Sequence, residues 1–320
     1  MLKKYFSKEN ICWIIFAAVI FTLITFLMNV GVIGSYYQIT LYNICINVIL
    51  AVSLNLIIGV CGQFSLGHAG FMCIGAYSAA IVVRSMSNLL GFALGVGIGI
   101  VISTIAALIV SIPTLRLRGD YLAIATLGFS EIIRIIVLNL KITNGAAGLS
   151  GIAKLTTWPL LFVLMVASIV IVTNFSRSRQ GRACISIRED EIASEAMGVN
   201  TTRYKTTAFV IGAALASVAG ALYACNFYVI KPDLFTFNKS IDILVMVVFG
   251  GMGSMTGSVI AAAFIGVLNM LLQNFSSIRM VIYGVVLVAI MIFRPGGLLG
   301  TKEFTFSALL HRKRKEKGRK

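Results

Sequence analysis

Charged residues are scarce in this chain of 320 residues: only 12% are Asp, Glu, Lys or Arg, whereas 58% are hydrophobic. Soluble domains carry about twice that share of charge, and a mean hydropathy of +0.96 is far outside their usual range. The longest polar stretch, residues 175–205, is too short to form a second domain. These shortages exclude a soluble globular protein and predict one membrane domain with loops.

Histidine is rare, and the cysteines lack the spacing of a binding motif. The two histidines, His68 and His311, lie neither in an HExxH motif nor beside cysteines and carboxylates. The six cysteines have no CxxC spacing and fall mostly in apolar runs, where a thiol behaves as a small hydrophobe. The stretch "GGMGSMTGS" lacks the lysine of a phosphate-binding loop. We therefore expect no disulfide framework, metal site, bound nucleotide or other cofactor.

Long apolar runs make up most of the chain. They are continuous, unlike the alternating ten-residue segments of a membrane β-barrel, and helices satisfy their own backbone polar groups in lipid. The predicted fold class is all-α, a polytopic helical membrane protein with about ten transmembrane helices. The expected runs are 11–33, 37–59, 66–83, 89–112, 120–140, 158–174, 207–230, 240–250, 257–274 and 279–293. The eighth run is short for a full crossing and fits a re-entrant or half-broken helix.

Lysine and arginine are distributed unevenly among the loops. They concentrate in residues 1–10, in the loop 175–206 and after Phe293. By the positive-inside rule, we expect both termini and this loop in the cytosol. The net charge of +16 then reflects membrane orientation and requires no nucleic acid. The chain divides into a membrane domain, residues 1–300, and a basic cytosolic tail, residues 301–320, which we expect against anionic lipid headgroups.

Small residues recur at every fourth position in two of the runs. Such spacing forms a groove that admits the backbone of a neighbouring helix, so we expect tight helix packing there. The positions are Gly91, Gly95 and Gly99 in one run, and Gly212, Ala216 and Gly220 in the other.

The segment "GQFSLGHAGF", residues 62–71, places polar residues and glycines between two apolar runs. A metal site is excluded by the lack of further ligands. A catalytic pair of His68 with Ser150, which lies in a "GLSG" motif, would need residues that the expected topology places on opposite sides of the bilayer. We favour a broken or tightly packed helix entry, where Gln63, Ser65 and His68 satisfy freed backbone groups or line a polar path.

Glu131 and Arg134 lie within an apolar run and are neighbours on one helix face. A lone charge near the middle of the membrane costs at least roughly 3 kcal/mol, so we expect the pair to face the bundle interior. Two interpretations stay open. Glu131 belongs to a translocation pathway or gate, or the two residues neutralise each other and fix helix packing.

The loop 175–206 contains the segment "SIREDEIASEAMGVN", which is typical of a short surface helix. We expect this helix to begin at Ser186, with acidic residues in its first turn, and to end at Gly198, a common C-terminal cap. A partial apolar stripe of Ile187, Ile192, Ala196 and Met197 would give it one face for docking to a partner or to the membrane surface.

The loop resembles the EAA-type coupling loop of ABC importer permeases, with Glu195, Ala196 and Gly198 at the recognisable positions. More specifically, the chain is similar to the LivM-type permease subunits of branched-chain amino acid ABC transporters. The similar segments run in family order from Leu54 to Ala262: "LNLIIGVCGQFSLGHAGFMCIGAYSAA", "LRLRGDYLAIATLGFSEIIRI", "TNGAAGLSGI", "GRACISIREDEIASEAMGVNTTRYK" and "VVFGGMGSMTGSVIAA". "FRPGGLLG", near the end, also fits.

The resemblance implies an ABC importer permease fold and a transport subunit that is not itself an enzyme. Its partners would be a second, homologous permease subunit, two cytosolic ATPase subunits and a soluble amino-acid-binding protein. Glu195, Ala196 and Gly198 would then belong to the loop that docks on the ATPase, and the chain would lie in a bacterial inner membrane. Two alternatives stay open: an ABC permease for urea or another small amide, and an ion-coupled secondary transporter.

Overall fold

The computed structural model describes residues 8–31, 34–114 and 120–272, with isolated positions between 281 and 300. Within these residues, nine helices coincide with the first nine predicted apolar runs. They are α1 (Lys8–Asn29), α2 (Ser35–Asn55), α3 (His68–Ser85), α4 (Leu89–Thr114), α5 (Asp120–Asn139), α6 (Trp158–Arg177), α9 (Thr201–Ala224), α10 (Phe237–Gly250) and α11 (Met255–Leu271). The predicted all-α class is confirmed. Most of the tenth run, 279–293, and the whole tail, 301–320, lie outside the described residues.

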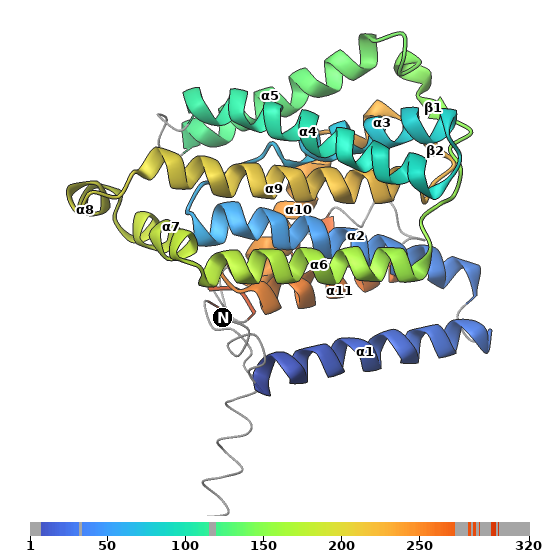
Figure 1. The fold of residues 1–320 in the computed structure, drawn as a ribbon, viewed down its shortest axis with the longest axis horizontal. Coiled ribbons are helices and arrows are strands. Elements are labelled where there is room, and N and C mark those ends of the chain that lie inside the picture. The colour runs from blue at the N-terminus through green and yellow to red at the C-terminus, as the bar shows by residue number, and fades with distance from the viewer. Residues whose placement is uncertain are drawn as a thin grey trace, which may run out of the picture.

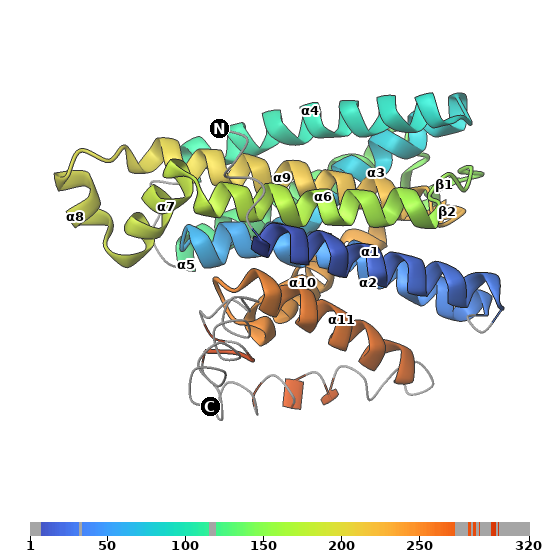
Figure 2. The same cartoon turned by 60° about the horizontal axis from the view of Figure 1, so that its bottom comes forward.

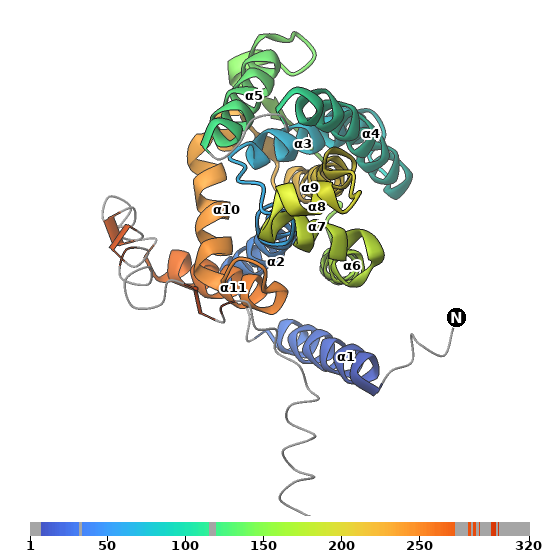
Figure 3. The same ribbon diagram turned by 90° about the vertical axis from the view of Figure 1, so that its left-hand side faces the viewer.

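Five of the helices are long and apolar enough to cross a membrane, and they differ sharply in burial. In an apolar 18-residue window of Ser35–Val60, 89% of the residues are buried inside the bundle, because apolar residues surround the helix on every side there. In Leu89–Pro113 and Trp158–Arg177 the buried share falls to 28%. Figure 3 shows α2 enclosed by its neighbours, with α4 and α6 at the periphery. The outer helices therefore present their apolar side chains to lipid.

The tightest packing joins α3, α4 and α9, where glycines replace side chains at the contacts. A Cβ at Gly220 of α9 would overlap the carbonyl oxygen of Met72 in α3. A Cβ at Gly95 of α4 would lie 2.8 Å from the Cα of Ala79, also in α3. The predicted role of these small residues in close helix packing is confirmed, since any larger side chain would separate the backbones.

The short eighth run forms α10, which differs in direction from the rest of the bundle. Its 14 residues extend about 21 Å, less than the roughly 30 Å of the hydrocarbon core. In Figure 3 α10 is viewed from the side, whereas α2 and α6 are viewed end-on, so α10 lies across the bundle. The run is therefore short, as expected, and forms one continuous helix. A turn at Gly251–Ser254 joins it to α11.

The two ends of the bundle have different structures (Figures 1 and 2). At one end lie two short helices, α7 (Arg179–Glu189) and α8 (Glu191–Ala196). At the other, β1 (Leu149–Ser150) and β2 (Val229–Ile230) form an antiparallel clasp, with Leu149 opposite Ile230. Two short 3₁₀ turns, η3 (Gly145–Ala147) and η4 (Pro232–Phe235), adjoin the clasp. The length of the bundle therefore separates the α7–α8 loop from the β1–β2 clasp.

Candidate functional site

The chain is broken between α2 and α3 at the segment that the sequence singles out. α2 ends in a π-helical turn, η2 (Leu56–Val60), and Gly62 follows with φ of +70°. Residues 63–67 have no regular structure before α3 begins at His68. Gln63, Ser65 and His68 are nonetheless at most 2% exposed. The predicted irregular helix entry is confirmed, and its polar side chains are buried in protein, where irregular backbone is tolerated at membrane depth.

Hydroxyl groups from three helices satisfy polar groups at this break. The Oγ of Ser53 in α2 lies 2.8 Å from Nε2 of His68. The Oγ1 of Thr126 in α5 accepts a hydrogen bond of 3.0 Å from the backbone N–H of Leu66. Ser240 of α10 accepts one of 3.2 Å from the N–H of Ala69. Side chains of α5 and α10 thus accept hydrogen bonds from backbone N–H groups at the start of α3. These bonds attach the irregular segment to the neighbouring helices.

Some polar atoms at the break have no partner within the described part of the chain. They are both amide atoms of Gln63 and Nδ1 of His68. A buried polar group without a hydrogen bond costs about 1–3 kcal/mol, so these atoms mark a place where water or a ligand is favoured. The alternative pairing with Ser150 is not formed, because His68 meets Ser53 while Ser150 belongs to the β1–β2 clasp. Among the described residues, no cluster of His, Cys, Asp or Glu fits a metal ion.

A second break, the α10–α11 turn, is attached to the first by Asn55. The Oδ1 of Asn55 accepts a hydrogen bond of 2.8 Å from the N–H of Gly253, and its Nδ2 donates one of 2.9 Å to the carbonyl of Ser254. A Cβ at Gly59 would overlap both Asn55 and Gly253. The end of α2 and the turn therefore form one packed unit. The sequence analysis did not identify Asn55, although a polar asparagine within the apolar run 37–59 indicates a buried hydrogen-bonding partner.

The predicted ion pair in α5 is confirmed, but its orientation differs from the expectation. Nε of Arg134 donates a hydrogen bond of 2.8 Å to Oε1 of Glu131, and its Nη1 lies 3.7 Å from a carboxylate oxygen of Asp233 in η4. The Glu131 side chain is 40% exposed, so the expectation that the pair faces the interior of this bundle is wrong for Glu131. α5 lies at the periphery and turns this face toward α10 and η4 (Figure 3).

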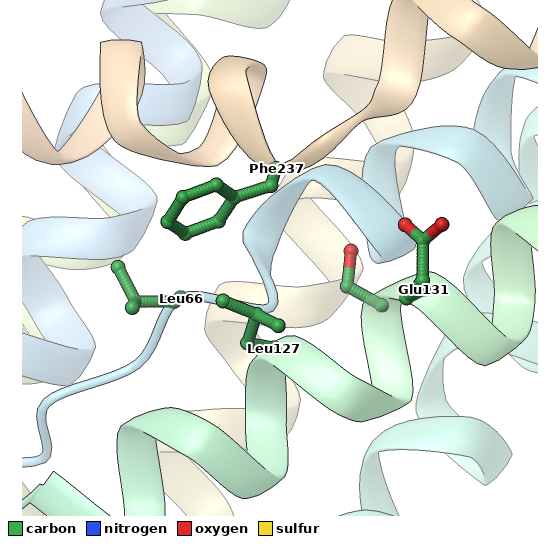
Figure 4. A pocket seen from close by; sticks show the side chains of 5 residues that line it. Leu66, Leu127, Glu131 and Phe237 are labelled. Atoms are coloured by element: carbon green, nitrogen blue, oxygen red, sulfur yellow. The ribbon is translucent and has the colours of Figure 1, made fainter.

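Glu131 lines a small open pocket between α5, α10 and the break. The other lining residues are Leu66, Leu127, Ser130 and Phe237. Figure 4 shows the three apolar side chains grouped together with the Glu131 carboxylate beside them. The cavity has a volume of about 10 Å³, room for roughly one water molecule and far below the roughly 300–1,000 Å³ of a typical small-molecule site. It combines an apolar wall with one carboxylate and is only partly enclosed by this chain.

The loop between α6 and α9 contains two helices where the sequence predicts one. Asp190 has φ of −152° and ψ of 110°, which ends α7, and its side chain accepts a hydrogen bond of 3.0 Å from the N–H of Ala193 to begin α8. The expectation of a helix beginning at Ser186 is therefore wrong. Ser186 lies inside α7, and its hydroxyl is 2.8 Å from that of Ser194 in α8. The capping tendency of aspartate permits the interruption, and the contact between Ser186 and Ser194 stabilises it.

The residues predicted for docking lie on or beside α8. Glu195 and Ala196 are exposed, and Oε1 of Glu195 accepts a hydrogen bond of 2.7 Å from the hydroxyl of Thr201. Gly198 follows with φ of +83°, so the predicted helix end is confirmed. The residues of the predicted apolar stripe lie on two helices, and only some of them are buried. Ile187 is buried, whereas Ile192 is 67% and Met197 is 84% exposed.

Comparison with known proteins agrees with this architecture. The family model described as "Branched-chain amino acid transport system / permease component" matches residues 36–293. The high-affinity branched-chain amino acid transport system permease proteins LivM of Salmonella typhimurium and of Escherichia coli are each 37% identical over 289 residues, which cover 79% of this chain and 68% of the relative. The LivH permease protein of Escherichia coli is 32% identical over 148 residues, 46% of this chain and 47% of that protein.

No solved structure matches the chain. The family model nevertheless spans most of the chain, including α2 to α11, the irregular segment between α2 and α3, and the α7–α8 loop. The chain therefore belongs to the permease components of branched-chain amino acid transport systems and is a multi-pass membrane protein of the LivM type.

Proposed function

We propose that the chain is the transmembrane permease subunit of an ATP-binding cassette importer for branched-chain, hydrophobic amino acids. The family match carries this proposal. The chain would work by alternating access in a bacterial inner membrane, driven by ATP hydrolysis on separate subunits. The unequal distribution of lysine and arginine supports an orientation with both termini and the α7–α8 loop in the cytosol and the β1–β2 clasp outside.

Two cytosolic ATPase subunits are the partners proposed for the α7–α8 loop. Ile192 and Met197 form an exposed apolar face on α8, and Glu195, Ala196 and Gly198 lie beside it. An exposed apolar face at the end of a bundle favours a docked partner. The "GGMGSMTGS" segment does not suit ATP, because the N–H of Gly253 is already bonded to Asn55. This supports a transport subunit that leaves hydrolysis to its partners.

A second, homologous permease subunit is proposed to complete the substrate path, and a soluble binding protein would deliver the amino acid at the clasp end. The pocket beside Glu131 is small and open, as expected of one wall of a path between two subunits. An amino acid with a branched side chain would place its apolar part against Leu66, Leu127 and Phe237 and its ammonium near the Glu131 carboxylate. Gln63, Ser65 and His68 would line the adjoining polar part of the path.

The proposal is tested by reconstituting the chain in proteoliposomes with a second permease, ATPase subunits and a leucine-loaded binding protein. We expect leucine uptake that requires ATP and stimulation of ATP hydrolysis by the loaded binding protein. Uptake that follows an ion gradient and needs no ATPase subunits would establish the secondary transporter instead. Uptake of urea but not of leucine through the complete complex would establish the amide permease.

Charge variants in α5 should separate the two interpretations of the Glu131–Arg134 pair. Glu131→Gln removes the partner of Arg134 and should reduce folded yield, because an arginine in the membrane is left without its nearest carboxylate. The double variant Glu131→Gln with Arg134→Met should restore the yield. If Glu131 receives the substrate ammonium, leucine uptake by the double variant should remain about tenfold or more below wild type, as expected for a lost charged hydrogen bond.

Folded yield is measured by size-exclusion chromatography and uptake with labelled leucine. Recovery of both quantities in the double variant would contradict the pathway interpretation and leave the pair as a packing element. A double variant with no better yield than the single variant would contradict mutual neutralisation.

A further inference from the structure

Arg188 connects the α7–α8 loop to the interior of the bundle. It lies in the last turn of α7, and its Nη1 donates a hydrogen bond to the carbonyl oxygen of Gly59 in the π-helical turn at the end of α2. The carbonyls next to Gly59 have backbone partners, since Ile58 accepts from Gly62 and Ile57 accepts from Gln63. A guanidinium suits this place, because the end of a helix presents carbonyls and partial negative charge.

Glycines from both helix breaks make room for the Arg188 side chain. A Cβ at Gly62 would lie 2.8 Å from Cγ of Arg188. A Cβ at Gly253, in the α10–α11 turn, would lie 3.1 Å from its Nη1. The arginine therefore lies against the end of α2, the start of the irregular segment and the α10–α11 turn. Asn55 joins the same elements from inside the bundle through its bond to Gly253.

The charge of Arg188 is balanced at the loop, which orients the guanidinium. Oε1 of the neighbouring Glu189 accepts hydrogen bonds of 2.6 Å from Nη2 and 3.2 Å from Nε. These bonds occupy one edge of the planar group and leave Nη1 directed at Gly59. The side chain is 28% exposed, so the bond to Gly59 is largely protected from water. Arg182 of the same helix differs, because its Nη1 donates a hydrogen bond to the carbonyl of Arg177 at the end of α6.

Side-chain contacts connect α8 to α7 and to α9, so that a movement of α8 would also move α7. The hydroxyls of Ser186 and Ser194 join the two helices, and Lys205 of α9 pairs with Glu191 of α8. Beyond Gly62, the irregular segment leads directly to Gln63, Ser65 and His68. A continuous chain of contacts thus runs from the exposed face of α8, through α7 and Arg188, to the buried polar residues of the break.

We infer that Arg188 is the positioning residue that transmits movement of the α7–α8 loop to both helix breaks and thereby to the substrate path. The inference rests on the proposed function, since it assigns the residue through which the ATPase stroke acts. Loss of the Arg188 side chain removes the hydrogen bond from α7 to Gly59 and the contacts with Gly62 and Gly253, while α8 keeps its docking face. ATP hydrolysis then continues, but the path no longer opens in step with it.

The test compares Arg188→Gln, Arg188→Lys and the control Arg182→Gln in the reconstituted complex. Leucine uptake per ATP hydrolysed should fall about tenfold in Arg188→Gln, because glutamine is shorter and uncharged. Arg188→Lys should give an intermediate ratio, since lysine keeps one charged donor, and Arg182→Gln should match wild type. A wild-type ratio in Arg188→Gln, or an equal loss in both glutamine variants, would overturn the inference.

A second measurement excludes a merely structural role and remains decisive if Arg188→Gln does not accumulate. In a cysteine-free background, Ser65→Cys reports on the break through its rate of thiol labelling. ATP should change this rate in the otherwise unmodified complex, and the change should be reduced by Arg188→Lys and abolished by Arg188→Gln. An undiminished response to ATP in Arg188→Lys, together with its normal uptake ratio, would overturn the role of Arg188.

Failure of the proposed function gives a different result from failure of this inference. If the wild-type complex shows no ATP-dependent uptake, both are rejected. If wild type transports leucine and Arg188→Gln transports it with the same uptake per ATP, the importer assignment stands and only the role of Arg188 is rejected.

Discussion

Gly198→Val is expected to separate ATP hydrolysis from amino-acid uptake while leaving the permease inserted and folded. Gly198 has φ of +83° and ends α8 through two hydrogen bonds, from its own N–H to the carbonyl of Glu195 at 2.9 Å and from Val199 N–H to Ser194 at 3.0 Å. A β-branched residue in this conformation costs at least about 1–2 kcal/mol. A helix of six residues has few other bonds to offset that cost, so its end should unwind.

The open surroundings of Gly198 mean that Gly198→Val tests only the backbone conformation at this position. No atom lies within 4 Å of the position that its Cβ would occupy, so valine meets no steric obstacle and only the conformation penalises it. Gly198→Asn is the matched variant, because asparagine tolerates a positive φ. We expect uptake per ATP to fall about tenfold in the valine variant and to stay near wild type in the asparagine variant. Normal coupling in the valine variant would make the loop a mere connector.

Gly75→Val is expected to have the largest effect on folding. Gly75 of α3 lies directly against the backbone of Ser217 in α9, where an added Cβ would overlap the carbonyl oxygen. Since both partners are backbone atoms of packed helices, no side-chain movement can relieve the overlap. Overpacking of well-packed sites costs typically about 1–3 kcal/mol, and separating two helices should cost more than that range. We expect at least a tenfold loss of monodisperse protein in size-exclusion chromatography.

Gly97→Val in α4 is the control for this experiment. Gly97 is exposed on the outer face of its helix, and nothing lies within 4 Å of its Cβ position. The substitution brings the same side chain and the same change in helix propensity, but it adds only a lipid-facing methyl pair. Its yield and melting temperature should stay close to wild type. Equal losses in both variants would mean that helix propensity, and not the contact between α3 and α9, explains the effect.

Within the described residues, the polar side chains proposed to line the substrate path lie at a helix break inside an apolar core. Gln63, Ser65 and His68 lie on the irregular segment after α2, and the α10–α11 turn is fastened to it by Asn55. Such irregular segments bend at lower cost than continuous helices because fewer backbone bonds must be broken. They are therefore suited to move when the loop outside the bundle moves, which is the requirement of alternating access.

The apolar runs determined the membrane-spanning helices by themselves, because a continuous run in lipid has only one way to satisfy its backbone. The short eighth run already indicated that α10 is a short helix, and small residues at every fourth position already indicated close packing of α4 and α9. Gly198 was predictable for a similar reason, since a glycine that ends a polar helix acts through its own backbone. These features depend on neighbours within a few residues in the chain.

Only the tertiary structure decided which distant residues meet. Asn55 and Gly253, or Arg188 and Gly59, are far apart in sequence, and no periodicity relates them. The sequence indicated that Glu131 and Arg134 form a pair, because they are three residues apart, but their direction depends on where α5 lies against α10. Asp190 could equally have continued one helix or divided it, and contacts such as Ser186 with Ser194 stabilise the divided form. Long-range contacts of this kind follow from the packing of whole helices, which local residue patterns do not specify.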